Sequence, residues 1–338
     1  MTDDRCPVIL LTGFLGSGKT TLLNRLLRDP ALSDSLVIVN EFGDIPLDHL
    51  LITHVDENIR LLDTGCVCCT VRGDLIDTLV DLRDRRVRGE IRYSRVFIET
   101  SGLVDPAPIF HSFAVDPTLT ADWELCAVVT TVDAVNGVAT LARHEQAQRQ
   151  VGLADLVIIT KGDIATTEQS GAIETRVDQL NHYAKRILVE QDGLAALLTS
   201  PDLRQSFAVP SVAEHGHHHG HGHDHSHPST ICSRSLFLDA PVPQAVVLEW
   251  IDLLAALRGE NLLRLKALIQ TVETPDRPML VQVVQHVVHP VQQLDAWPDE
   301  ERRSRIVIIG DDLDLDMIEN SFRRHLERAG AVSSVESR

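Results

Sequence analysis

Short apolar runs alternate with amphipathic stretches over roughly the first 200 residues of the chain. The runs occupy residues 8–11, 36–39, 96–98, 127–129 and 156–159, and the stretch 58–62 precedes a turn before Cys66. Continuous apolar runs separated by helix-like segments are typical of parallel strands whose two faces are both covered by helices. The pattern therefore predicts an α/β domain with a mostly parallel sheet, over residues 1–204.

The pattern changes after that domain. Residues 215–227 alternate histidine with glycine and other small polar residues, and hold eight of the 16 histidines. Such a segment cannot bury apolar surface, so we expect a flexible His-rich linker over residues 205–231. A smaller α+β domain is predicted over residues 232–330. Its expected strands are 235–238, 262–268, 279–288 and 305–309, and its expected helices are 245–257 and 314–326.

Composition narrows the classes of partner. A chain of 338 residues with 43% hydrophobic residues is long enough for about two domains with sizeable cores. The net charge of −18 and the 4% aromatic content argue against nucleic acid as a partner. The sequence holds no window of about 18 apolar residues and starts with acidic rather than signal-like residues, so we expect no membrane partner and a cytoplasmic location.

A phosphate-loop motif dominates the candidate chemistry. Residues 13–20 read Gly-Phe-Leu-Gly-Ser-Gly-Lys-Thr, after an apolar run and before a helix-like stretch. Glycines let backbone N–H groups close around phosphates, and the helix N-terminus adds partial positive charge. Lys19 can then reach the phosphate oxygens, and the Thr20 hydroxyl can ligate Mg²⁺. The predicted nucleotide-contacting residues of the loop are Gly13, Gly16, Ser17, Gly18, Lys19 and Thr20.

A second motif indicates the base. The run 156–159 ends in Thr160, Lys161 and, two positions on, Asp163, where GTPases usually carry Asn-Lys-x-Asp. The Asp163 carboxylate can accept hydrogen bonds from the guanine N1–H and exocyclic amine, which adenine lacks. Thr160 stands in place of the usual asparagine. The motif predicts a guanine nucleotide.

The γ-phosphate side is indicated by Glu99 and Gly102, at the end of the run 96–98. A carboxylate at this strand end can hold the Mg²⁺ shell or a water, and the Gly102 N–H can meet the γ-phosphate. Lys19 and Glu99 are thus the candidate catalytic residues. No glutamine is placed by sequence to orient the attacking water, so we expect slow intrinsic hydrolysis.

Three thiols stand within four residues, at Cys66, Cys68 and Cys69. In a reducing compartment, clustered cysteines indicate a metal before a disulfide. Zinc takes four tetrahedral ligands, and Glu41 is one candidate for the fourth. A buried cluster of small apolar residues, a redox pair and a structural zinc site stay open as alternatives.

The motifs together resemble the CobW-type metal-handling GTPases. The Cys-x-Cys-Cys motif within a phosphate-loop GTPase is highly specific for that family, and the similarity spans nearly the whole chain. The resemblance implies GTP/GDP and Mg²⁺ as cofactors, with Thr21 added to the nucleotide-binding residues. It also implies a transition metal as cargo on the three cysteines, and its GTP-dependent delivery to a client metalloprotein. Thiolate and imidazole ligands favour Zn²⁺ as this cargo, with Co²⁺ second.

Three alternatives remain open from sequence. The chain could supply metal for cobalamin synthesis or to a nitrile hydratase. It could instead store or sense metal, which the His-rich segment favours and the intact phosphate loop argues against. An ATP-using kinase is the weakest alternative, because no acceptor-binding signature is present.

Overall fold

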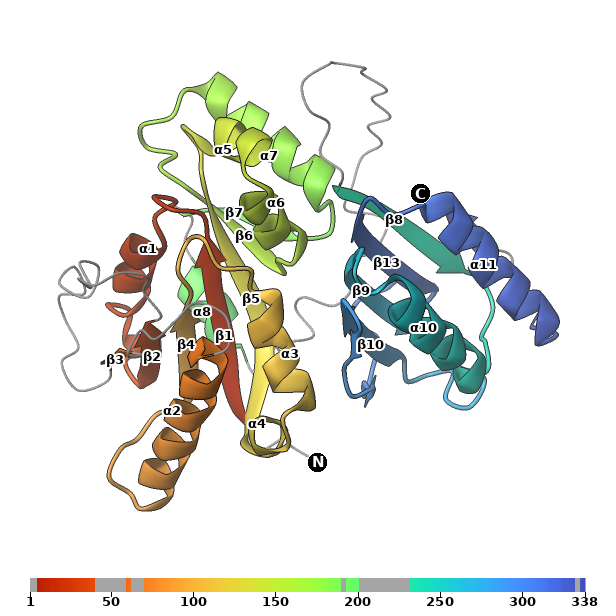
Figure 1. Cartoon of the computed structure of the whole chain (residues 1–338), viewed down its shortest axis with the longest axis horizontal. Helices are drawn as coiled ribbons and strands as arrows, with labels where there is room; N and C mark the ends of the chain where they lie inside the picture. The colour runs from red at the N-terminus through yellow and green to blue at the C-terminus, as the bar shows by residue number, and fades with distance from the viewer. Residues whose placement is uncertain are drawn as a thin grey trace. The chain divides into compact units, whose positions relative to one another are not determined.

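The computed structural model describes residues 5–39, 59–61, 70–189, 193–200, 231–331 and 335–337. It divides into two compact units. The first takes Met1–Val177 and Ala184–Arg204, and the second takes Asp178–Tyr183 and Gln205–Arg338. Each unit has its own sheet (Figure 1). The exact domain limits proposed from sequence stay a prediction.

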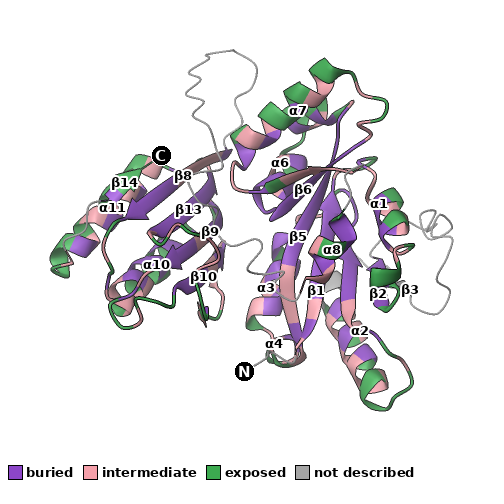
Figure 2. Ribbon diagram, turned by 180° about the vertical axis from the view of Figure 1, so that it is seen from behind, coloured by how far each residue is buried: buried purple, intermediate pink, exposed green. Residues whose placement is uncertain are grey.

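The first unit is built on a parallel sheet of seven described strands in the order β3-β2-β4-β1-β5-β6-β7. The strands are β1 Cys6–Gly13, β2 Ser35–Val39, β3 Ile59–Leu61, β4 Arg95–Glu99, β5 Trp123–Asp133, β6 Leu156–Thr160 and β7 Lys185–Leu188. Almost every residue of β1, β2, β4 and β6 is buried, as their apolar sequences predict (Figure 2). The α/β expectation is confirmed.

Helices lie over both faces of this sheet: α3 lies in front of it and α8 behind it in the view of Figure 1. The helices of the unit are α1 Lys19–Leu26, α2 Thr70–Val87, α3 Ala107–Val115, α4 Pro117–Asp122, α5 Gly137–Arg143, α6 Glu145–Gly152, α7 Thr167–Leu180 and α8 Leu194–Thr199, with a 3-10 turn at Pro30–Leu32. Because all strands run parallel, the carboxyl ends of β1, β4, β5 and β6 meet at one edge of the sheet. Ligands bind at that edge in open α/β sheets.

The second unit is an antiparallel sheet packed against helices α10 (Gln244–Arg258) and α11 (Leu315–Arg328), which confirms the α+β expectation. Its strands are β8 Ile231–Leu238, β9 Leu262–Ile269, β10 Met279–Val284, β11 Val287–Val288, β12 Gln292–Gln293, β13 Ser304–Asp311 and β14 Val335–Ser337. Trp250 and Phe322, one from each helix, pack with ring centroids 4.4 Å apart in its core.

One strand predicted from sequence is wrong. Residues 279–288 form a hairpin, in which β10 ends at Val284 and β11 pairs back antiparallel to it. Gln285 takes a φ of 53° at the turn, and its N–H donates to the Leu262 carbonyl at 3.0 Å. His286 approaches Gly259 so closely that a Cβ there would lie 2.1 Å from its Nδ1. Contacts with a distant glycine fix this turn, and no turn residue in the local sequence indicates it.

Candidate functional site

The phosphate-loop residues form a turn between β1 and α1 with three glycines at positive φ. The φ angles are 140° at Gly13, 73° at Gly16 and 92° at Gly18. Side chains other than glycine rarely adopt such angles, so the sequence pattern has a direct backbone reason. Gly18 is also the N-cap of α1 and carries no side chain to occupy the first-turn N–H groups. These groups point toward the loop and suit an anion.

A side-chain contact holds the phosphate loop against strand β5. The Ser17 hydroxyl is buried and lies 2.7 Å from the Thr131 hydroxyl. A Cβ at Gly13 would come within 2.4 Å of the same Thr131 oxygen, so only glycine fits there. The hydroxyl of Ser17 therefore anchors the loop to the sheet. Its predicted nucleotide contact stays a prediction.

Lys19 and Thr20 lie where the motif predicts, at the start of α1. The Lys19 ammonium donates to the carbonyls of Gly13 at 2.9 Å and Phe14 at 3.3 Å, so it folds back over the loop. The Thr20 hydroxyl donates to the Glu99 carboxylate at 2.9 Å. Glu99 is the last residue of β4 and only 2% exposed. Two residues 79 positions apart in sequence thus meet at the carboxyl edge of the sheet.

The hydroxyl of Thr20 and the carboxylate of Glu99 are hard oxygen donors of the kind Mg²⁺ prefers. Their contact supports the sequence prediction that this point holds the cation of a bound nucleotide. Thr21, which the family resemblance added, is exposed on the next position of α1.

Gly102 lies directly against the phosphate loop. A Cβ at this position would be 2.5 Å from the backbone nitrogen of Leu15 and 2.9 Å from its Cα. The preceding Thr100 is tied to β1, because its N–H donates to the Leu11 carbonyl at 2.9 Å. The segment after β4 and the phosphate loop therefore touch through backbone, as the predicted γ-phosphate contact of Gly102 requires.

The predicted base turn follows β6 at the same edge. The Thr160 hydroxyl donates to the Ser17 carbonyl at 2.6 Å, so this turn is bonded directly to the phosphate loop. Asp163 is exposed and accessible to a ligand. Lys161 forms an ion pair at 2.7 Å with Asp133, the last residue of β5. Sequence reasoning missed Asp133, because Thr130 and Thr131 separate it from the apolar run 127–129 and hide the end of the strand.

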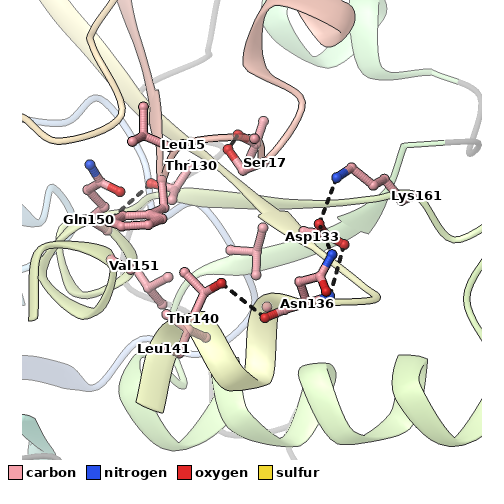
Figure 3. Close-up of a pocket in the computed structure, with 16 residues that line it drawn as sticks. Leu15, Ser17, Thr130, Asp133, Asn136, Thr140, Leu141, Gln150, Val151 and Lys161 are labelled. Carbon is pink, nitrogen blue, oxygen red and sulfur yellow. Dashed lines mark hydrogen bonds and ion pairs between the residues drawn. The ribbon is translucent and has the colours of Figure 1, made fainter. Parts of the chain in front are cut away.

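The structure contains a cavity of about 180 Å³ beside the phosphate loop, shown in Figure 3. It lies between the loop, the end of β5 and helices α5 and α6. Asp133 and Asn136 stand at one end, and Gln150 at the other. Phe14 of the loop stacks on His144 with ring centroids 4.4 Å apart. The phosphate loop is thus held at two points, by the stacking of Phe14 on His144 and by the contact of Ser17 with Thr131.

The predicted metal ligands Cys66, Cys68, Cys69 and Glu41 lie outside the described residues, as does the His-rich segment 215–227. Within the described ranges, no group of three or more His, Cys, Asp or Glu side chains is arranged to hold a metal ion. Cys6, Cys126 and Cys232 are free thiols, and none of them belongs to such a group. No helix in the described part of the chain is long and apolar enough to span a membrane.

Comparison with known proteins gives matches over both units. The family model described as CobW/HypB/UreG, nucleotide-binding domain, matches residues 7–196. The model of the cobalamin synthesis protein cobW C-terminal domain matches residues 231–326. The chain is 32% identical to the zinc chaperone YjiA of Escherichia coli K12, over 93% of this chain and 97% of that relative.

Two further similarities also extend over nearly the full length. The chain is 30% identical to the zinc chaperone CobW of Pseudomonas aeruginosa, over 95% of this chain and 92% of that protein. The crystal structure of a zinc-bound triple mutant of YjiA GTPase matches with a TM-score of 0.69 at 25% identity, covering 95% of this chain and 99% of that one.

Proposed function

The chain belongs to the CobW/HypB/UreG family of GTPases, and from this premise we propose that it is a zinc metallochaperone driven by GTP. Its fold and its relatives support GTP hydrolysis as the activity. Zinc is the proposed cargo because both full-length relatives carry the name zinc chaperone, with cobalt as the second candidate. The client is a metalloprotein that receives the ion in the cytoplasm.

The nucleotide is proposed to bind along the carboxyl edge of the first sheet. The phosphate loop and Lys19 would surround the phosphates, and Asp163 would accept hydrogen bonds from guanine. Thr20 and Glu99 would hold Mg²⁺, which supplies positive charge to the phosphates when it is bound. Glu99 is also the candidate catalytic residue, whose carboxylate would hold a water near the γ-phosphate. With no glutamine assigned to orient that water, we expect slow turnover in the isolated protein.

The link between nucleotide and metal rests on where the described strands end. In the sheet register Val39 of β2 is opposite Glu99 of β4 on one side and Leu61 of β3 on the other. Glu41 follows Val39 by two positions, and Cys66 follows Leu61 by five. The segments that carry the proposed metal ligands thus continue from β2, which is paired with β4, and from β3, which is paired with β2.

The observation that carries the proposal is the contact of Thr20 with Glu99 at this edge. A γ-phosphate and its cation would act on the end of β4, which is hydrogen-bonded to β2. The nucleotide state and the segments that follow β2 and β3 could then bias one conformational equilibrium. Such coupling is reciprocal: if GTP tightens the metal site, the metal tightens GTP binding by the same factor.

The first prediction tests this coupling directly. Zn²⁺ and Co²⁺ are titrated anaerobically against a competing chelator, with Mg²⁺ and either GTP or GDP present. We expect one tight site per chain in the GTP form and an affinity about 5- to 150-fold lower in the GDP form, because typical coupling energies are about 1–3 kcal/mol. Replacing Cys66, Cys68 and Cys69 by serine should abolish this nucleotide-dependent site.

Cys126→Ser is the matched control, since this half-buried thiol lies on β5 outside the cluster. It should leave both affinities unchanged. Equal metal affinity with GTP and GDP would contradict the coupling. Many weakly bound ions per chain, indifferent to nucleotide and to the triple substitution, would point to metal storage on the His-rich segment instead.

A further inference from the structure

The turn that would read the base is held by strand β5 through a buried carboxylate. Asp133 ends β5 with its side chain 10% exposed, and its Oδ2 lies 2.7 Å from the Lys161 ammonium. The carboxylate also accepts hydrogen bonds from the backbone N–H of Val135 at 2.7 Å and Asn136 at 3.1 Å. The Asn136 side-chain amide donates to it at 3.1 Å (Figure 3). The hydrogen bonds from residues 135 and 136 hold the Asp133 carboxylate in place, so that it can in turn orient the Lys161 side chain.

Lys161 needs such an anchor because its backbone is unfavourable. Its φ is 61°, in the left-handed region that residues other than glycine, asparagine and aspartate rarely occupy. Conformations of this kind cost on the order of 1 kcal/mol or more and persist where the surroundings impose them. Glycine would adopt this angle more readily, but the glycine of this turn stands at position 162 and not at 161. The ion pair with Asp133 is one of the contacts that hold the residue in this conformation.

Two further bonds hold the same turn. The Thr160 hydroxyl donates to the Ser17 carbonyl, and the Thr160 carbonyl accepts from the Ala134 N–H at 2.9 Å. The turn is thus joined to the phosphate loop at Thr160 and to β5 at Lys161. Asp163, which is exposed, follows Lys161 with a single glycine between them. The position of Lys161 therefore influences where the Asp163 carboxylate points.

We propose that Asp133 is a positioning residue for guanine recognition: it holds Lys161 so that Asp163 faces the N1–H and exocyclic amine of the base. This inference rests on the proposed guanine-binding role of Asp163. Hydrogen bonds from Lys161 and Asn136 outweigh the effect of burial and keep the pKa of Asp133 below its ordinary value, so the carboxylate stays charged at neutral pH. Two different residues of β5 then support the two parts of the site: Asp133 supports the base turn, and Thr131 supports the phosphate loop.

The second prediction separates these supports by using ligands with and without a base. Binding of GDP, IDP and inorganic pyrophosphate is measured on the full-length protein and on Asp133→Asn. Asparagine keeps an oxygen for the Val135 and Asn136 N–H groups but loses the charge that Lys161 requires. We expect GDP affinity to fall by about tenfold or more, since a hydrogen bond between charged groups is among the stronger ones. Pyrophosphate affinity should stay within about twofold, and the preference for GDP over IDP should shrink.

Two more variants make the test independent of folding defects. Lys161→Met removes the other partner from a partly exposed turn, and should reproduce the loss of GDP affinity. In the double variant the two losses should not add, because Asp133 acts through Lys161. Glu145→Gln, which breaks an exposed ion pair with Arg149 on α6, is the control and should change nothing.

Three results would overturn the inference. Asp133→Asn could leave GDP affinity unchanged, it could weaken GDP and pyrophosphate equally, or its effect could add fully to that of Lys161→Met. Failure of the proposed function looks different. In that case the unmodified protein shows no preference for GDP over ADP, which removes the guanine site and this inference together.

Discussion

Cys6 at the start of β1 is a thiol that the fold keeps protonated. Burial raises its pKa from 9.0 to about 11, and the charges of Arg86 and Arg95 offset this only in part. Its sulfur lies against the Ser94 carbonyl at 3.7 Å. In the unfolded chain the same thiol ionises near its ordinary value. Cys6 should therefore be inert toward thiol reagents in the folded protein.

The third prediction follows from the sign of this pKa shift. The folded-state pKa is the higher one, so the stabilising contribution is complete below about pH 9 and is lost as the pH rises toward 11. The unfolding free energy of the unmodified protein should therefore fall relative to Cys6→Ala by about 1.4 kcal/mol between roughly pH 8 and pH 10. Urea denaturation of both proteins across this range measures the difference. A difference that stays constant with pH would show that Cys6 does not keep its proton.

Site residues could be predicted from sequence where a single motif contains both the residue and the contacts that explain its role. The glycines at positive φ, Lys19 and Thr20 all belong to a single turn. Thr131 and Asp133 could not be found that way, because they act on residues 114 and 28 positions away. Only the parallel pairing of β5 with β1 and β6 brings them to the phosphate loop and the base turn.

At the scale of elements, the contact between the segment after β4 and the phosphate loop depends on one glycine. Gly102 is buried, and a Cβ there would meet the backbone nitrogen and Cα of Leu15 as well as its side chain, so moving the side chain aside would not make room. The loop that would hold the phosphates cannot shift without disturbing its bonds to Thr131 and Thr160. The two elements therefore lie so close together that position 102 has room for a hydrogen atom but not for a Cβ.

The fourth prediction compares two glycine substitutions. Gly102→Ala should lower GTP affinity at least about tenfold and destabilise the fold by about 1–3 kcal/mol, as overpacking does. Gly171→Ala is the control, because this exposed position in α7 has no atom within 4 Å of the added Cβ. It should leave GTP binding intact and stabilise the protein by up to about 1 kcal/mol. Denaturation and nucleotide titration of both variants test this, and normal GTP affinity in Gly102→Ala would contradict the close packing.

Most elements of the first unit could be predicted because strands buried on both faces have continuous apolar sequences. Even so, β5 runs from Trp123 to Asp133, well beyond the predicted residues 127–129. Its first half is only partly buried, and its second half includes Thr130 and Thr131, which face hydrogen-bond partners. Polar residues used for internal bonds interrupt the apolar pattern and hide the strand ends, where this fold places its site.

At the scale of the molecule, each unit has its own hydrophobic core. The core of the second unit is formed by its sheet with α10 and α11. All the proposed nucleotide contacts lie in the first unit. A ligand that binds only the folded state stabilises the unit that holds it. The nucleotide therefore offers a way to ask whether the two cores unfold together or separately.

The fifth prediction is that Mg²⁺ with GDP raises the unfolding temperature of the first unit and leaves that of the second unchanged. At about one hundred times the Kd the ligand contributes about 2.7 kcal/mol, which corresponds to roughly 5–10 °C for a unit of this size. Calorimetry should resolve two transitions that separate further with GDP but not with ADP. Of the three tryptophans, Trp123 belongs to the first unit, and Trp250 and Trp297 to the second. In Trp123→Phe, tryptophan fluorescence thus follows the second unit alone and should not respond to GDP. If the fluorescence transition instead shifts by the same amount as the first calorimetric transition, the two units unfold together. Nucleotide binding to the first unit then stabilises the second unit as well.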